Sequence, residues 1–303
     1  MNTNQGDLGC ENTFLMRFYY FNAFKILNMK IGVDLGGTNI RTALCKEDKI
    51  LDQKQHELIN KESVSNTIEQ LISLIRAVFR PEVKGIGIGV PSVVDIQKGI
   101  VYNVTHIPSW KKVELKDILE KEFGVPVYVN NDVNCFILGE YMHGNAKGYD
   151  PVVGLAIGTG LGSGIINEGK LFIGANCGAG EVGPMPYMGK TLEYFVSGNF
   201  FKSFYNTTAR EMAEKAYNGD TQAIKAWEEF GHHMGNAVKI VAYAYDPQAI
   251  ILGGSISKAY SLFEKSMMSS LQDFEFPESL KKLKIMVTSN PDITILGAAS
   301  LVM

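Results

Sequence analysis

Cysteine is scarce in this sequence. The four cysteines among 303 residues are Cys10, Cys45, Cys135 and Cys177, and no two of them form a C-x-x-C pair or another metal-binding spacing. Scattered cysteines of this kind argue against a disulfide framework and against a cysteine-based zinc site. They are typical of a protein in a reducing compartment, so we expect a cytoplasmic location.

An excess of basic residues is also lacking. Lys and Arg together number 29 and Asp and Glu together number 32, which gives a formal net charge of −3. A surface with this balance provides no broad basic patch for nucleic acid or for an anionic membrane. The apolar content of 46% and the charged content of 20% are those of a globular protein with its own core. At this length we expect two domains.

No apolar run is long enough to span a membrane, although the first 28 residues are rich in aromatic side chains. Arg17, Asn22 and Lys25 interrupt that segment, which is too short and too broken to cross a bilayer. It also lacks the basic start and the small-residue cleavage site of a signal peptide. Met29 directly precedes the first predicted strand and resembles a natural start. We therefore expect residues 1–28 to be an extension outside the folded core, and we expect no membrane partner.

The sequence does contain a pair of glycine-centred hairpins, and the first spans Ile31 to Arg41 (I-G-V-D-L-G-G-T-N-I-R). Apolar residues alternate on both sides of Gly36 and Gly37, which predicts two antiparallel strands joined by a tight turn. Glycines at the turn let backbone N–H groups approach an anion closely. Asp34 can hold a hydrated Mg²⁺ beside a phosphate, and Thr38 adds a hydroxyl donor. Taken alone, the pattern is equally typical of an ordinary hairpin.

The second hairpin lies in the other half of the chain, from Val152 to Leu171. An apolar strand again leads into a Gly/Thr turn, Gly158-Thr159-Gly160, and a second strand leaves it. Two such hairpins predict a duplicated fold that holds a nucleotide between its halves. A third turn, Gly253-Gly254, follows a predicted strand over Ala249 to Leu252. This turn suits a flat ligand such as adenine or ribose, but it is equally typical of a helix entry.

A polar triplet, Asn130-Asn131-Asp132, follows a predicted strand over Val125 to Val129. In open α/β sheets, ligands bind at the carboxyl ends of the strands, which is where this triplet lies. Asn and Asp are also favoured helix N-caps, and capping accounts for one of the three residues without any function. Farther along, Glu181 in a glycine-rich loop and Glu193 are two further candidate acids.

Periodicity predicts the remaining elements. Helices are expected over Ser65 to Phe79, Leu115 to Phe123, the region Ala209 to Tyr245 and Ile295 to Val302, and further strands over Val83 to Val90 and Ile285 to Val287.

Taken in order, these motifs resemble the ROK family of sugar kinases and repressors, within the actin-like/hexokinase ATPase superfamily. The resemblance covers Met29 to the C-terminus. Its motifs are D-L-G-G-T at Asp34–Thr38, G-I-G-V-P-S-V-V-D at Gly87–Asp95, N-N-D-V-N at Asn130–Asn134 with Glu140 after it, I-G-T-G-L-G-S-G-I at Ile157–Ile165, A-G-E-V-G at Ala179–Gly183, L-E at Leu192–Glu193 and I-L-G-G-S at Ile251–Ser255.

The resemblance implies an α/β fold of two ribonuclease-H-like lobes with a cleft for a nucleotide and a sugar between them. The N-terminal lobe would span residues 29–131 and be closed by the C-terminal helix at about 293–303, and the C-terminal lobe would span 132–292. The implied ligands are ATP, Mg²⁺ and a hexose. Relatives are often dimers, so the resemblance is compatible with a homodimer.

The same resemblance implies roles for individual residues. Asp132 matches the family's general base, which accepts the proton of the sugar's 6-hydroxyl as that oxygen attacks the γ-phosphorus. The positions matching sugar contacts are Ser92, Thr105, Asn131, Asp132, Glu181 and Glu193. The positions matching contacts to ATP and its phosphates are Asp34, Gly36, Gly37, Thr38, Gly158, Thr159, Gly160, Gly253 and Gly254, with Asp34 binding Mg²⁺ through water.

The chain departs from the family pattern at the zinc site. Most relatives carry E-x-G-H followed by C-x-C-G-x-x-G-C-x-E, whose histidine and three cysteines bind a structural zinc. Pro184 stands at the histidine position, and the shortened segment Met185 to Glu193 contains neither Cys nor His. Because none of the four ligands remains, we expect no zinc and a looser recognition of the sugar.

The implied activity is ATP-dependent phosphorylation of a hexose at its 6-hydroxyl, with glucose as the first candidate and an N-acetylhexosamine as the alternative. A ROK-type transcriptional regulator is an alternative from another class, but such regulators carry a winged helix-turn-helix domain for which 28 residues are too few. A filament-forming or chaperone ATPase would not need the set Asn131, Asp132, Glu181 and Glu193. We therefore expect an enzyme, a sugar kinase, with no nucleic acid partner.

Overall fold

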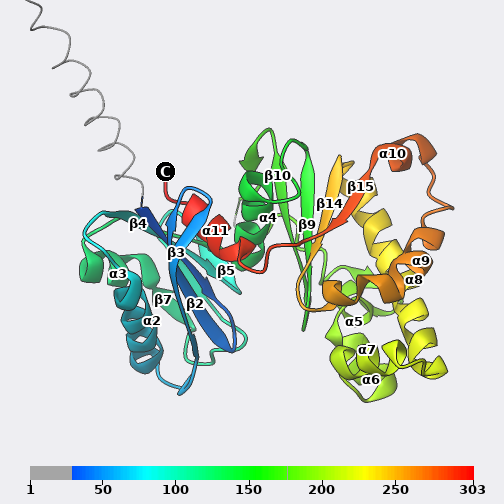
Figure 1. Ribbon diagram of the computed structural model, residues 1–303, viewed down its shortest axis with the longest axis horizontal. Coiled ribbons are helices and arrows are strands. Elements are labelled where there is room, and N and C mark those ends of the chain that lie inside the picture. The colour runs from blue at the N-terminus through cyan, green and yellow to red at the C-terminus, as the bar shows by residue number, and fades with distance from the viewer. Residues whose placement is uncertain (1–28, 176) are drawn as a thin grey trace, which may run out of the picture.

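The structure, a computed structural model, describes residues 29–175 and 177–303, and the extension expected at residues 1–28 lies outside the described residues. Two five-stranded sheets lie side by side, with helices α4 (Asp132–His143) and α11 (Ile293–Ser300) between them (Figure 1). The predicted α/β fold of two ribonuclease-H-like halves is confirmed.

The first sheet has the strand order β3-β2-β1-β4-β8. Its strands are β1 (Met29–Leu35), β2 (Asn39–Lys46), β3 (Lys49–Glu57), β4 (Val83–Val90) and β8 (Val127–Asn131). β1 pairs antiparallel with β2 and parallel with β4, and β4 pairs parallel with β8. The glycine turn after β1 and the polar triplet at the end of β8 therefore lie at the same edge of the sheet.

The second sheet repeats this arrangement with the order β11-β10-β9-β14-β15. Its strands are β9 (Val152–Ile157), β10 (Leu161–Asn167), β11 (Lys170–Leu171), β14 (Ala249–Gly253) and β15 (Lys284–Val287). β9 pairs antiparallel with β10 and parallel with β14, as β1 does with β2 and β4. Each half thus contains a hairpin followed by parallel strands, which is the duplication that the two glycine turns predict.

The other elements surround the two sheets. The helices are α2 (Val64–Val78), α3 (Leu115–Phe123), α5 (Leu192–Phe195), α6 (Gly198–Tyr205), α7 (Ala209–Tyr217), α8 (Thr221–Tyr245), the 3₁₀ helix η1 (Ile256–Ala259), α9 (Tyr260–Ser270) and α10 (Pro277–Lys282). Two small sheets consist of β5 (Val93–Asp95), β6 (Ile100–Tyr102) and β7 (Lys112–Glu114), and of β12 (Pro186–Tyr187) and β13 (Lys190–Thr191).

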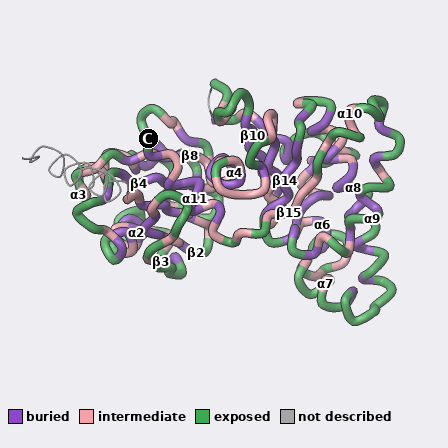
Figure 2. The backbone as a smooth tube through the Cα atoms, turned by 45° about the horizontal axis from the view of Figure 1, so that its top comes forward, coloured by how far each residue is buried: buried purple, intermediate pink, exposed green. Residues whose placement is uncertain are grey.

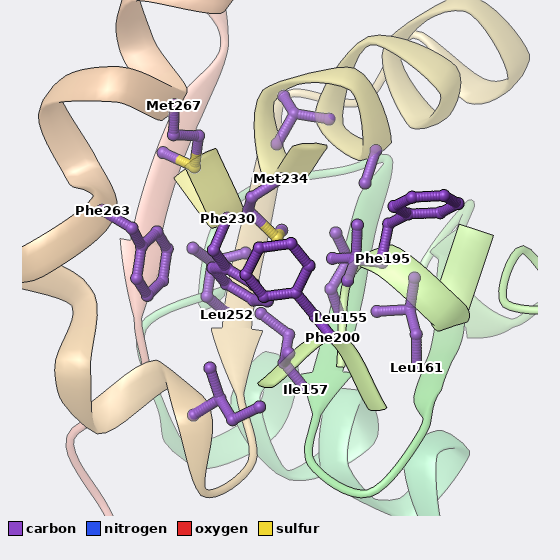
Figure 3. Packing of buried hydrophobic residues seen from close by; sticks show 14 of the residues in the cluster. Leu155, Ile157, Leu161, Phe195, Phe200, Phe230, Met234, Leu252, Phe263 and Met267 are labelled. Carbon is purple, nitrogen blue, oxygen red and sulfur yellow. The ribbon is translucent and has the colours of Figure 1, made fainter. Parts of the chain in front are cut away.

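The larger core lies between the second sheet and the helices after it. Apolar side chains of β9 and β14 pack against aromatic and methionine side chains from α6, α8 and α9 (Figure 3). β14 is buried along its whole length (Figure 2), which is usual for a parallel strand whose sheet is covered on both faces. This packing fixes the carboxyl ends of the strands that carry the second and third glycine turns.

Helix α11 contacts α4 and the first sheet at backbone distance, because glycines stand at the crossing points. A Cβ atom added at Gly297 would lie 1.8 Å from the carbonyl oxygen of Cys135 on α4. One added at Gly87 of β4 would lie 1.8 Å from the carbonyl oxygen of Ala298 on α11, and one added at Gly139 of α4 would lie 2.1 Å from that of Ile293. The closing helix is therefore held tightly from two sides.

Some elements differ from the sequence prediction. β3 was not predicted, because most of its side chains are exposed and give no apolar alternation. The helical region from Ala209 divides into α7 and α8 around Gly219, which has a positive φ of 85°. β8 begins two residues later than predicted, at Val127. In the described part of the chain, no helix is both long and apolar enough to cross a membrane.

Candidate active site

A cavity of about 640 Å³ lies where the two halves of the molecule meet. Its lining combines residues that follow strands of both sheets. From the first half come Pro91, Ser92, Val93, Asn103, Thr105 and Asn131; Asp132 and Val133 belong to α4; from the second half come Ala156, Gly158, Thr159, Gly160, Leu161, Gly162, Glu181, Pro184, Glu193 and Gly254. All six residues predicted to contact the sugar therefore line one cavity.

Asp132 is the first residue of α4, so its carboxyl lies at the positive end of the helix. Its Oδ1 accepts a hydrogen bond of 2.9 Å from the backbone N–H of Val133. Burial and, to a smaller extent, the nearby carboxylates of Asp34 and Glu181 raise the pKa of Asp132 to about 7, although hydrogen bonds from the backbone act to lower it. A carboxyl group that titrates near neutral pH can take up and return a proton under physiological conditions.

The two asparagines before Asp132 have different surroundings. Asn131 is the N-cap of α4: its Oδ1 accepts from the N–H groups of Val133 at 2.8 Å and Asn134 at 3.3 Å. Asn130 is buried, and its Oδ1 accepts from Asn131 N at 2.8 Å and Asn134 Nδ2 at 3.0 Å. Capping thus explains Asn131 and internal packing explains Asn130. Neither capping nor internal packing accounts for the carboxyl group of Asp132.

Glu181 and Glu193 line the cavity together with Asp132. Burial and the charge of Glu193 both raise the pKa of Glu181. The Oε2 atom of Glu193 lies 3.5 Å from Leu161 N, and a Cβ added at Gly160 would come within 2.9 Å of it. The Glu193 carboxylate therefore packs closely against the Gly158–Gly160 turn. Two carboxylates facing one cavity can accept several hydroxyl protons from a bound polyol.

The first hairpin lies beside the cavity, and its turn residues Gly36, Gly37 and Thr38 do not line it. Gly37 instead packs against the loop that contains Thr105. A Cβ added at Gly37 would lie 2.5 Å from the Cβ of His106, the residue after Thr105. The absence of a side chain at Gly37 is therefore required for this packing.

Asp34, at the end of β1, is paired with Arg41 of β2. Its Oδ2 accepts from Arg41 Nη2 at 2.6 Å and from Arg41 Nε at 3.1 Å. Within the described residues, no protein group donates a hydrogen bond to the other oxygen, Oδ1. A carboxylate with one oxygen fixed by a guanidinium and the other available suits a hydrated Mg²⁺, which proteins bind through one or two carboxylates and water.

A second cavity of about 610 Å³ shares Gly158 and Thr159 with the first. Lys202 and Arg210 contribute cationic side chains to its lining, which extends to Ser255 after the third glycine turn. Gly254 lines the first cavity, whereas Gly253 lines neither: a Cβ there would lie 2.4 Å from the ring of Phe136. Gly253, the last residue of β14, is therefore required for packing on Phe136, and ligand binding at the third turn remains a prediction.

Asn103 and Arg41 are among the residues at or beside the site that were not predicted from the sequence. Asn103 lines the cavity from the loop after β6 with a positive φ of 47°, and no sequence signal identifies it. Arg41 had a signal, because a tight turn places it directly opposite Asp34 in the hairpin register. Among residues 29–175 and 177–303, no group of three or more His, Cys, Asp or Glu side chains is arranged to hold a metal ion.

Two duplicated α/β halves with a polar cavity between them define the class: the fold is that of the actin-like ATPases. The profile of the ROK family matches residues 30–303, so the chain belongs to the ROK family. Glucokinase from Thermotoga maritima is 30% identical over an alignment of 305 positions that covers 90% of this chain and 96% of the relative.

The chain is also similar to a solved glucokinase structure and to a repressor. The ROK family glucokinase from Streptomyces griseus, solved in complex with glucose and AMPPNP, is 25% identical and superimposes with a TM-score of 0.77 over 90% of this chain and 99% of that chain. The xylose repressor of Bacillus spizizenii is 26% identical over 90% of this chain and 76% of the repressor. The family therefore includes both kinases and repressors among the relatives of this chain.

Proposed function

We propose that the protein is an ATP-dependent kinase that phosphorylates the 6-hydroxyl of a hexose, with glucose as the first candidate. One observation carries this proposal: Asp132, whose pKa is raised to about 7, faces the same cavity as Glu181, Glu193 and the Gly158–Gly160 turn. A base, a set of hydroxyl acceptors and a glycine turn for phosphate are what phosphoryl transfer to a sugar requires.

In the proposed reaction, the carboxylate of Asp132 accepts the proton of the sugar hydroxyl. The hydroxyl oxygen forms a bond to the γ-phosphorus, and the bond from that phosphorus to the bridging oxygen breaks, so ADP leaves with the electron pair. Glu181 and Glu193 would hold other hydroxyls of the sugar, aided by Ser92, Thr105 and Asn131. A well-placed base contributes about 10²–10⁴-fold to the rate.

The nucleotide would occupy the second cavity, with its phosphates at the Gly158–Gly160 turn. Lys202 and Arg210 support this placement, because they are the cationic side chains of that lining. The Gly36–Thr38 turn would complete the phosphate site from the first half when the two halves close. Asp34 would hold Mg²⁺ through water, and the ion would neutralise charge on the phosphates.

The test is a coupled assay of ADP release with ATP and Mg²⁺ over glucose, mannose, N-acetylglucosamine and N-acetylmannosamine. We expect turnover with glucose and with at least one other hexose, because Pro184 offers no polar side chain to the sugar. A preference of about 10⁴ or more in kcat/KM for one sugar over its C2 variants would contradict the looser recognition. Sugar binding without any turnover would reject the kinase in favour of a regulator.

A further inference from the structure

The β12–β13 hairpin stands between two residues of the cavity lining, Pro184 and Glu193. Backbone bonds fix Glu193 to the base of this hairpin: Leu192 N donates to Met185 O at 2.8 Å, and Glu193 N donates to Gly183 O at 3.0 Å. The hairpin has two residues in each strand, and a ribbon of that size has little stability of its own. Burial of Leu192 and Phe195 anchors α5 itself, and the remaining freedom of the Glu193 carboxylate depends on what holds the hairpin.

Tyr187 joins the hairpin to helix α8. Its hydroxyl oxygen lies 3.1 Å from Nδ1 of His233 and accepts a 3.0 Å hydrogen bond from Nδ2 of Asn236. Since the hydroxyl accepts from Asn236, its own proton is available for His233 Nδ1, which requires the neutral imidazole with its proton on Nε2. Burial lowers the pKa of His233, which favours that neutral form.

The ring of Tyr187 is held as well. It meets Phe195 edge-on at a centroid distance of 5.4 Å and His233 at 5.8 Å. Phe195 is the last residue of α5, the helix that contains Glu193. The Tyr187 side chain thus contacts both α8 and α5, the short helix that contains Glu193.

We propose that Tyr187 is a positioning residue of the sugar site, whose hydroxyl, bonded to His233 and Asn236, holds the β12–β13 hairpin on α8 and so sets the place of the Glu193 carboxylate. This inference rests on the proposed function, because it assigns Glu193 to sugar binding. Tyr187 itself does not line the cavity, so its effect on the sugar would be exerted through Glu193.

Tyr194 provides a matched control, because its ring also contacts Phe195. Its ring meets Phe195 at 5.2 Å and Phe204 at 5.8 Å. In the described part of the chain, its hydroxyl makes no hydrogen bond to another protein group. Removing the Tyr194 hydroxyl therefore tests the loss of a phenol oxygen next to Glu193 without the loss of the contact to α8.

The experiment compares Tyr187→Phe with Tyr194→Phe in the full-length protein. For Tyr187→Phe we expect the KM for the sugar, and its Kd by calorimetry without ATP, to rise about 3–10-fold, since one hydrogen bond is worth about 0.5–1.5 kcal/mol. The kcat and the KM for ATP should stay within about twofold of wild type. His233→Phe should raise the sugar KM similarly, and the double variant should add little to either single change.

The outcomes distinguish the positioning role of Tyr187 from a general loss of stability. They also distinguish it from failure of the proposed kinase function. An unchanged sugar Kd in Tyr187→Phe, an equal shift in Tyr194→Phe, or a parallel rise of both KM values with a lower Tm would overturn the positioning role. A wild-type protein that turns over no sugar would reject the kinase instead. The sugar Kd would still test Tyr187 in that case.

Discussion

The carboxyl group of Asp132 shows how one position at a helix start can be given a chemical role. Its charged form is disfavoured by burial and by the carboxylates of Asp34 and Glu181, so it holds its proton to a pH near 7. Asn131 already caps the helix, and Asp132 is therefore not needed for that purpose. Its substitution should affect the reaction far more than the fold.

For Asp132→Asn we expect kcat to fall by about 10²–10⁴-fold, because the amide keeps the shape but accepts no proton. The Kd for the sugar should change by only a few-fold. Steady-state kinetics and calorimetry measure the two quantities. Asp117→Asn, at an exposed acid in the first turn of α3, is the control and should leave both unchanged. Turnover within a few-fold of wild type in Asp132→Asn would remove this residue from the role of base.

The pKa of Asp132 also predicts a pH profile. The proposed base acts in its deprotonated form, so kcat/KM should rise with pH, about tenfold per unit below pH 7, and level off above it. A profile measured from pH 5.5 to 8.5 at constant ionic strength would show this inflection. An inflection near pH 4, the usual range of a carboxyl group, would contradict the raised pKa.

At the residue scale, the sequence predicted which acids line the cavity, but it did not predict the side-chain contacts around them. Asp132, Glu181 and Glu193 were predicted from motifs, because the acids themselves are visible in the chain. The pairing of Tyr187 with His233 was not predicted, since the two residues are 46 positions apart and neither belongs to a motif. Nothing in local periodicity reports a contact over that distance.

At the scale of elements, the contact of α4 with α11 depends on the absence of side chains. Gly297→Ala should lower the free energy of unfolding by about 1–3 kcal/mol, because its Cβ would stand 1.8 Å from the backbone oxygen of Cys135, which cannot rotate away. Helix propensity acts in the opposite direction, by about 1 kcal/mol in favour of Ala.

Thermal and denaturant unfolding would measure the balance between these two effects. Gly178→Ala is the control, since no atom lies within 4 Å of its added Cβ and its φ is not positive. Gly178→Ala should leave the Tm nearly unchanged. An unchanged or higher Tm in Gly297→Ala would mean that α4 and α11 move apart at little cost, which would contradict a tight backbone contact between them.

Elements with strong alternation were predicted well, and exposed or short ones were not. Both hairpins and β4 follow from apolar residues at every second position, which burial of one or both faces enforces. α6 was not predicted, although Phe200 and Phe201 are fully buried. Its eight residues complete few helical turns, so the periodic signal remains weak.

At the scale of the molecule, we propose that the lobes are residues 29–131 with 293–303, and residues 132–292. The ends of the first lobe are far apart in the sequence, yet α11 packs on the first sheet. Ala43 and Cys45 of β2 form a buried cluster with Ile295, Leu296 and Ala299 of α11. Completion of the first lobe therefore requires the last part of the chain.

Deletion of residues 293–303 tests this division. We expect the first sheet to lose its fold, since the face of β1 and β4 that carries glycines would have no cover. The sheet of the second half has a larger core that contains no residue of α11, and Ile293 is the one residue of that helix in its smaller buried cluster. This sheet should therefore keep most of its protection in hydrogen exchange. Deletion of Met303 alone, a fully exposed residue, is the control. Equal protection of both sheets in the longer deletion would refute the proposed lobes.

The dependence of the first sheet on α11 also bears on how the protein is made. The ribosome completes β8 well before it reaches α11, and at about 5–20 residues per second that interval lasts roughly 10–30 s. During this time the apolar face around Ala43 and Cys45 has no native cover. The nascent first half must therefore wait, exposed to aggregation or bound by a chaperone, while the second half can already fold beside it.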